Sequence, residues 1–183
     1  RSKIVKKRIR VEKEILSQIR YSFYRTQEMA EEIRQINPDI KLYFGTYPKN
    51  KNFPNQEVRK DYDIVFFARL TKDKGIEDLL HAVSIIKPNK ENINLIIIGS
   101  GKTNQLKSLA KRFNIETNIT WAGFLDTQQD VHKLASRARI SVLPTYHDII
   151  SGTIIESLFL KIPVVAYNVG SIHEINRKEE IIS

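Results

Sequence analysis

Cysteine is absent from this sequence of 183 residues, and methionine and tryptophan each occur once. Without cysteine the chain can form no disulfide, thiolate metal site or cysteine nucleophile, which agrees with a reducing compartment such as the cytoplasm. Long apolar runs are also lacking, since none approaches the roughly 18 residues that a membrane-spanning helix needs. The composition, with 41% hydrophobic and 28% charged residues, is ordinary for a soluble globular protein.

The net charge of +9 is concentrated at the beginning of the chain. Residues 1–25 hold nine Lys or Arg against two Glu, whereas residues 61–183 hold fifteen basic and fourteen acidic residues. Apolar residues such as Val11 and Ile15 recur at steps of four and seven, which predicts a helix over residues 3–24 with a basic outer face. Three interpretations of this helix stay open: packing on a core with solvated lysines, contact with anionic lipid, and nucleic-acid binding.

The chain length suits one well-cored domain together with a part of another. A second helix is predicted over residues 27–37, because Pro38 follows it, and residues 40–45 are expected to form a short strand. Residues 46–62 contain two prolines, three asparagines and scattered charge, which is typical of a linker.

From Asp61 onward, short apolar segments alternate regularly with amphipathic ones. This alternation predicts parallel strands joined by helical crossovers, in a doubly wound, Rossmann-like α/β fold with helices on both faces of the sheet. Ligands bind such sheets beyond the carboxyl ends of the strands. The expected strands are residues 63–68, 94–99, 118–123, 140–144 and 162–167, and the expected helices are residues 75–87, 103–113, 127–138 and 152–161.

The first two strands end in cations and glycines. Arg69 and Lys74 follow the first strand and are suited to hold an anion such as a diphosphate, although solvated loop cations are also common. Gly99 and Gly101 follow the second strand and are expected to form a tight turn near a ligand. They do not complete a dinucleotide fingerprint, because Asn104 stands where a third glycine is required.

The third and fourth strands add an apolar ledge and a helix start. Gly123 and Phe124 follow the third strand and suit a nucleobase, although core packing is the commoner role of a phenylalanine. After the fourth strand, a helix begins near Ser151, and its first amides, around Gly152 and Thr153, favour an anion.

Two carboxylates, Asp148 and Glu156, lie eight residues apart around this helix start. Glu156 also has the Thr-x-x-Glu spacing of a capping box with Thr153, in which it would only bond back to the helix. A ligand-binding role gains support because the four strand ends together offer the chemistries that a nucleotide diphosphate needs. No acidic cluster in the loops suggests a metal site, and we expect none. His81 and His132 are expected to be solvated residues on helix surfaces.

Four segments, "ARLTKDKGIEDLLHA", "LIIIGSG", "ITWAGFL" and "ISVLPTYHDIISGTIIESLFLKIPVVAYNVGSIHEI", resemble the donor-binding half of the retaining glycosyltransferases of family 4, which have the GT-B fold. The resemblance covers about residues 61–175. The family's Arg-x4-Lys-Gly pattern falls on Arg69, Lys74 and Gly75. Its Glu-x7-Glu element falls on Asp148 and Glu156.

By this resemblance, Arg69 and Lys74 bind the donor diphosphate, Glu156 bonds the nucleotide ribose and Asp148 faces the donor sugar. The donor would be a UDP- or GDP-sugar, with no obligatory metal and no further cofactor. The sequence departs from the family where Asp148 replaces the usual glutamate and where Ile149, Ile150 and Ser151 replace Gly-Phe-Gly, so the donor sugar is the least defined part of the site.

The resemblance also implies the organisation of the whole protein. Residues 1–60 would be a remnant of a preceding acceptor domain plus a linker, and residues 61–183 a nucleotide-sugar domain truncated at its C-terminus. We expect a cytoplasmic enzyme of polysaccharide or glycoconjugate biosynthesis, with a saccharide or lipid-linked acceptor bound by the missing domain. Residues 1–25 would contact the inner face of the membrane, and no nucleic acid is expected. The fragment alone should have little activity.

Two alternatives to a glycosyltransferase are consistent with the same residues. A nucleotide-sugar epimerase shares the GT-B architecture but requires no acceptor. A non-catalytic, basic nucleic-acid-binding module would use residues 1–25 and would bind oligonucleotides with a steep salt dependence.

Overall fold

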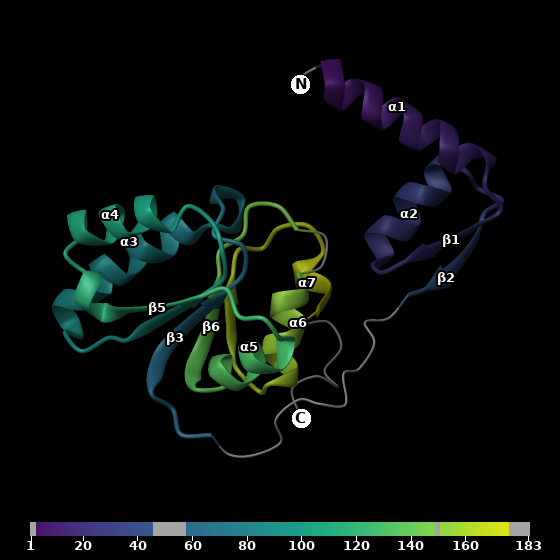
Figure 1. Cartoon of the computed structure of the whole chain (residues 1–183). Coiled ribbons are helices and arrows are strands. Elements are labelled where there is room, and N and C mark those ends of the chain that lie inside the picture. The colour runs from purple at the N-terminus through teal and green to yellow at the C-terminus, as the bar shows by residue number, and fades with distance from the viewer. Residues whose placement is uncertain (1–2, 46–57, 149–150, 176–183) are drawn as a thin grey trace. The chain divides into compact units, whose positions relative to one another are not determined.

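The computed structural model describes residues 3–45, 58–148 and 151–175 of the chain (Figure 1). The chain divides into two compact units, residues 1–49 and residues 50–183. No helix among the described residues is both long enough and apolar enough to span a bilayer.

The first unit consists of two helices and a two-stranded parallel sheet, in which Tyr21 lies opposite Lys41. The hydroxyl of Thr26 caps the second helix by accepting a hydrogen bond of 3.1 Å from the amide of Met29. In order, the elements are α1 (Lys3–Gln18), β1 (Tyr21–Tyr24), α2 (Gln27–Ile36) and β2 (Lys41–Phe44).

The helix predicted over residues 3–24 is wrong at its C-terminal end, because α1 stops at Gln18 and β1 follows. The side-chain amide of Asn37 donates to the carbonyl oxygens of Leu16 and Ile19, at 3.0 Å each, which satisfies acceptors where α1 ends. The aromatic residues of β1 are then free to pair with β2, an arrangement that aromatic side chains favour.

The second unit is built around a five-stranded parallel sheet with the order β5-β4-β3-β6-β7. Strands and helices alternate along the chain as the sequence predicts. The elements are β3 (Tyr62–Phe67), α3 (Ile76–Ile86), β4 (Leu95–Ile98), α4 (Thr103–Arg112), β5 (Ile119–Gly123), α5 (Gln128–Ala135), β6 (Ala138–Leu143), α6 (Gly152–Phe159), β7 (Val164–Ala166) and α7 (Ile172–Ile175), with short 3₁₀ turns η1 (Lys72–Lys74), η2 (Lys87–Asn89) and η3 (Glu116–Asn118).

The chain reverses its direction across this sheet between β3 and β6, which are neighbours. From β3 it continues to β4 and β5 on one side, and from β6 to β7 on the other. Side chains of β3 alternate between two cores: Ile64 and Phe66 pack with α3 and α4, whereas Val65 and Phe67 pack with α5. The predicted doubly wound, Rossmann-like α/β fold is therefore confirmed, and the carboxyl edge of β3 and β6 is the position where folds of this kind bind ligands.

The segment after β3 approaches the backbone after β6 closely at Gly75. Gly75 has a left-handed φ of 70°, and a Cβ at this position would overlap the carbonyl oxygen of Pro144. Next to it, the carbonyl oxygen of Asp73 accepts hydrogen bonds from the Tyr146 amide at 2.8 Å and from the Thr145 hydroxyl at 3.2 Å. Glycine is required here both by the backbone angle and by the space.

We predict that Gly75→Ala lowers the free energy of unfolding by about 3 kcal/mol or more, because the left-handed angle and the overlap with Pro144 both oppose a side chain. Gly123→Ala is the matched control: Gly123 has a φ of 72°, but a Cβ there meets nothing within 4 Å. It should cost only about 1 kcal/mol. Urea unfolding of both variants measures the difference, and equal losses would contradict the proposed close approach.

Candidate functional site

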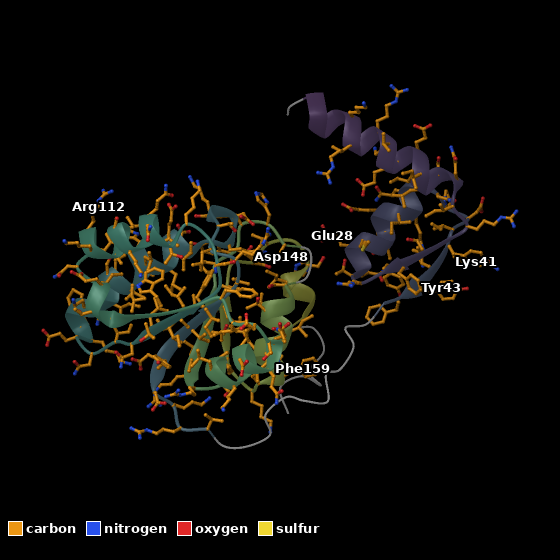
Figure 2. The ribbon with its side chains drawn as sticks, in the orientation of Figure 1. Glu28, Lys41, Tyr43, Arg112, Asp148 and Phe159 are labelled. Carbon is orange, nitrogen blue, oxygen red and sulfur yellow. The ribbon has the colours of Figure 1, made fainter. Side chains whose placement is uncertain are left out.

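Lys74 and Asp148 meet at the carboxyl edge where the chain reverses. Lys74 ends the turn η1 after β3, and Asp148 lies in the loop after β6 (Figure 2). The Lys74 Nζ atom is 2.7 Å from Asp148 Oδ2, and the two side chains are only 15% and 17% exposed. The structure thus brings together two of the predicted site residues, from segments 74 positions apart.

Arg69, the second predicted cation, is held differently. Its side chain is 72% exposed, and its Nη2 atom lies 3.9 Å from Asp73 Oδ2, a distance at the limit of an ion pair. Such an exposed pair contributes little to stability. Arg69 therefore keeps its planar array of donors available to an anion at the end of β3.

Glu156, the second residue of the predicted acid pair, is bound from helix α5. Its Oε2 atom accepts a hydrogen bond of 2.7 Å from the side-chain amide of Gln128 and lies 3.2 Å from His132 Nε2. The Glu156 side chain is 24% exposed. Asp148 and Glu156 consequently have different partners on different elements.

The capping-box interpretation of Thr153 and Glu156 is wrong. The N-cap of α6 is Ser151, a buried residue, and Gly152 and Thr153 are the first two residues of the helix. The Thr153 hydroxyl donates to the carbonyl oxygen of Phe67 at the end of β3, at 2.9 Å, so it is directed to the sheet. Ile149 and Ile150, where the sequence departs from the family pattern, lie outside the described residues.

His132 is a contact of Glu156 that the sequence interpretation missed. It was expected to be solvated, but it is 1% exposed and contacts Glu156, whereas His81 is exposed as expected. The spacing of Gln128 and His132, four residues apart on one helix, places both on the same face. Only the packing of α5 beside α6 shows that this face meets a carboxylate.

The two glycines of the predicted turn lie where the ends of β3 and β4 approach closely. Gly99 and Gly101 have positive φ angles of 143° and 156°, and a Cβ on either would overlap the backbone of Ala68 or Leu70. The amide of Gly99 donates to the carbonyl oxygen of Gly123 at 2.7 Å, which joins the ends of β4 and β5. Three strand ends are thus held together at this edge without intervening side chains.

Phe124 is exposed directly after β5 and is not part of the core. The alternative interpretation of Phe124 as a core residue is therefore wrong, while its proposed contact with a nucleobase stays a prediction. Among the described residues, no group of three or more His, Asp or Glu side chains could hold a metal ion.

A carboxylate shared by two tyrosines lies at the same edge and was not found from the sequence. Tyr146 follows β6 and Tyr167 follows β7, and both hydroxyls donate to Oδ2 of Asp78 in the first turn of α3. These bonds lower the pKa of Asp78, and the bond from Tyr146 raises the pKa of that tyrosine to about 12. The cluster attaches the loop that contains Asp148 to α3.

The sequence pattern of one protein family, described as "Glycosyl transferases group 1", matches residues 48–182. This chain belongs to that family. The matched range contains all of the sheet and every site residue named above. The predicted resemblance to a glycosyltransferase is thereby confirmed, while the assignment to family 4 and a retaining mechanism stay predictions.

Two curated relatives are glycosyltransferases by name. An uncharacterised glycosyltransferase of Methanocaldococcus jannaschii is 30% identical over 150 residues, which are 79% of this chain and 37% of that protein. The capsular polysaccharide biosynthesis glycosyltransferase CapM of Staphylococcus aureus is 26% identical over 112 residues, 61% of this chain and 29% of the relative. The chain therefore spans about a third of the length of these relatives.

Solved structures show the same fold. Sucrose-phosphate synthase from Thermosynechococcus elongatus aligns with a TM-score of 0.71 at 24% identity, over 92% of this chain and 46% of that one. HepE of Anabaena, solved in complex with UDP, aligns with a TM-score of 0.73 at 16% identity, over 92% of this chain and 50% of that one. The fold of this chain is therefore that of GT-B glycosyltransferase lobes, as the sequence predicts.

We predict that Asp78→Ala lowers the pKa of Tyr146 from about 12 toward its ordinary value of 10.0, because the carboxylate that accepts the hydrogen bond of its hydroxyl is removed. Only the protonated phenol donates, so this bond supports folding below the ordinary tyrosine pKa and is lost as the pH rises through about 12. The contribution of Asp78, whose pKa is lowered, is lost on acidification instead.

A spectrophotometric titration of tyrosinate measures this shift. Glu77→Ala is the matched control, since Glu77 is also an acidic residue in the first turn of α3 but raises the pKa of Tyr146 only through its charge, so it should shift the titration much less. Superimposable curves for Asp78→Ala and the unsubstituted chain would show that the carboxylate does not hold the tyrosine proton.

Proposed function

We propose that this chain is the donor-binding lobe of a retaining glycosyltransferase of family 4, which transfers a sugar from a nucleotide sugar to a saccharide or lipid-linked acceptor. The observation that carries the proposal is the Lys74–Asp148 pair at the reversal point between β3 and β6, 2.7 Å apart and largely shielded from water. Family membership supports the reaction class.

The proposed role of the cations is to stabilise the leaving diphosphate. Bond cleavage increases the negative charge on that group, and fixed positive charges lower the energy of the transition state. Lys74 is held in place by Asp148, and Arg69 is exposed at the same strand end. The amides at the start of α6 add donors, and together these groups supply the stabilisation without a metal ion.

The proposed roles of the two carboxylates differ because their surroundings differ. Asp148 pairs with Lys74 beside the diphosphate position and would face the donor sugar. Glu156 is held by α5 and would accept hydrogen bonds from the ribose hydroxyls. Phe124, exposed after β5, would support the base. The complex of HepE with UDP supports a uridine nucleotide as the first ligand to test.

Calorimetric titration with UDP, GDP, ADP and UMP tests the proposal. We expect one diphosphate to bind, and Lys74→Ala and Arg69→Ala to weaken it at least tenfold, because each removes a charge-assisted contact worth about 1.4 kcal/mol or more. Lys111→Ala, in the last turn of α4, is the matched loss of one positive charge and should bind normally. Equal weakening by all three substitutions would indicate only a general charge effect.

We also expect little or no transferase activity from this chain, since it spans about a third of the length of its relatives. Product analysis with and without an added saccharide acceptor checks this. Robust turnover with an acceptor would contradict it, and conversion of the donor without an acceptor would favour an epimerase.

We further propose a cytoplasmic protein with peripheral contact to the inner membrane face through residues 1–25. Along α1 the apolar side chains of Ile9, Val11 and Ile15 are exposed beside basic residues, which suits anionic lipid. In sedimentation with phosphatidylglycerol vesicles, the full chain should appear in the pellet with the vesicles. A chain that lacks residues 1–25 should stay in the supernatant. Equal sedimentation of both chains would remove this part of the proposal, and salt-dependent oligonucleotide binding would favour the nucleic-acid alternative.

A further inference from the structure

Two side chains of α5, Gln128 and His132, converge on one oxygen of Glu156. The amide nitrogen of Gln128 lies 2.7 Å from Glu156 Oε2, and His132 Nε2 lies 3.2 Å from the same atom. The resemblance to family 4 assigned no role to either residue. Their contact with a predicted ligand-binding carboxylate requires an explanation of its own.

Both side chains are attached to a well-fixed helix. The N-cap residue Thr127 accepts a hydrogen bond from the amide of Asp130 and donates its hydroxyl proton to the Asp130 carboxylate at 2.7 Å. Farther along, Ala135 is buried in the same core cluster as Val65 and Phe67 of β3. Since Gln128 and His132 are four residues apart, they project from one face of this anchored helix.

The proton positions follow from the donors and acceptors present. The ionised carboxylate of Glu156 can only accept, and the amide nitrogen of Gln128 can only donate. Gln128 Nε2 also lies 3.2 Å from His132 Nε2, but a His132 Nε2 without a proton would direct its lone pair at the charged carboxylate oxygen at the same distance, which is the less favourable contact. The hydrogen on Nε2 is assigned on this ground, so both side chains donate to Oε2.

Two donors on one oxygen fix the plane of the carboxylate. Rotation of the Glu156 side chain would break both bonds and take the carboxylate acceptor away from His132, which is only 1% exposed. Among the described residues none forms a hydrogen bond with the second oxygen, Oε1, although the Glu156 side chain is 24% exposed. That oxygen is thus held in one orientation with its acceptor sites available.

We propose that Gln128 and His132 are positioning residues that orient Glu156 for the ribose diol and thereby set the preference for ribonucleotides over nucleotides without ribose hydroxyls. This inference rests on the proposed function, in which Glu156 bonds the ribose. Neither residue touches the nucleotide itself. In such a site the ribose of the nucleotide is recognised by Glu156, separately from the diphosphate, which Lys74 and Arg69 hold.

The test compares the affinities of the whole chain for UDP and 2′,3′-dideoxy-UDP by calorimetry. We expect the unsubstituted chain to prefer UDP about tenfold or more. Gln128→Leu and His132→Phe should reduce this ratio to within about threefold while the affinity for dideoxy-UDP stays the same. His132→Gln, which restores an amide donor, should recover part of the preference. Gln129→Leu, on an exposed neighbour in α5, should behave like the unsubstituted chain.

A separate variant, Glu156→Gln, distinguishes this inference from the proposed function. If Glu156→Gln abolishes the preference while folded Gln128→Leu and His132→Phe retain it, Glu156 binds ribose without help from α5 and the inference is wrong. If Glu156→Gln leaves the preference unchanged, the ribose role in the proposed function fails. An equal loss of affinity for both nucleotides in the α5 variants would show a general disturbance and would also overturn the inference. Gln128 is exposed, so its variant remains informative even if His132→Phe does not fold.

Discussion

The close contact between the segment after β3 and the loop after β6 is the constraint on which the site depends. These two strands are neighbours in the sheet, yet the chain leaves them in opposite directions. Gly75 permits the approach to Pro144, and the Asp73 carbonyl oxygen accepts the hydrogen bond that holds the Tyr146 amide. Lys74 lies between Asp73 and Gly75, and Asp148 follows Tyr146 by two residues. The fold therefore places a cation and a carboxylate together at the position where doubly wound sheets bind their ligands.

The two carboxylates of the acid pair lie in different surroundings. Asp148 is paired with a cation from the β3 side, in surroundings suited to a diphosphate and the sugar attached to it. Glu156 is held by neutral donors from α5, in surroundings suited to hydroxyl groups. The hydrogen bonds from Tyr146 and Tyr167 to Asp78 attach the loop after β6, which contains Asp148, to α3. Electrostatic preorganisation requires fixed groups, and these groups are held by partners on different elements, η1, α5 and α3.

The sequence predicted most of the second unit because its strands are short, apolar and separated by amphipathic helices. Lys74 and Asp148 could be found from the sequence because both follow the carboxyl ends of predicted strands. Prediction from the sequence failed where tertiary contacts decide. The residues of β1 continue the apolar spacing of α1, so only the Asn37 side chain and the partner strand mark the helix end. The spacing of Thr153 and Glu156 suggested a cap, but the adjacent elements provide better partners. Burial of His132 depends on how α5 packs, which local spacing does not reveal.

A crystal structure of the chain with bound UDP would test the central claim most directly. The account predicts that diphosphate oxygens lie within hydrogen-bonding distance of Lys74 Nζ, at the carboxyl ends of β3 and β6, with the ribose beside Glu156. A diphosphate bound elsewhere on the chain, with the Lys74–Asp148 pair unchanged and the edge of β3 and β6 unoccupied, would contradict it.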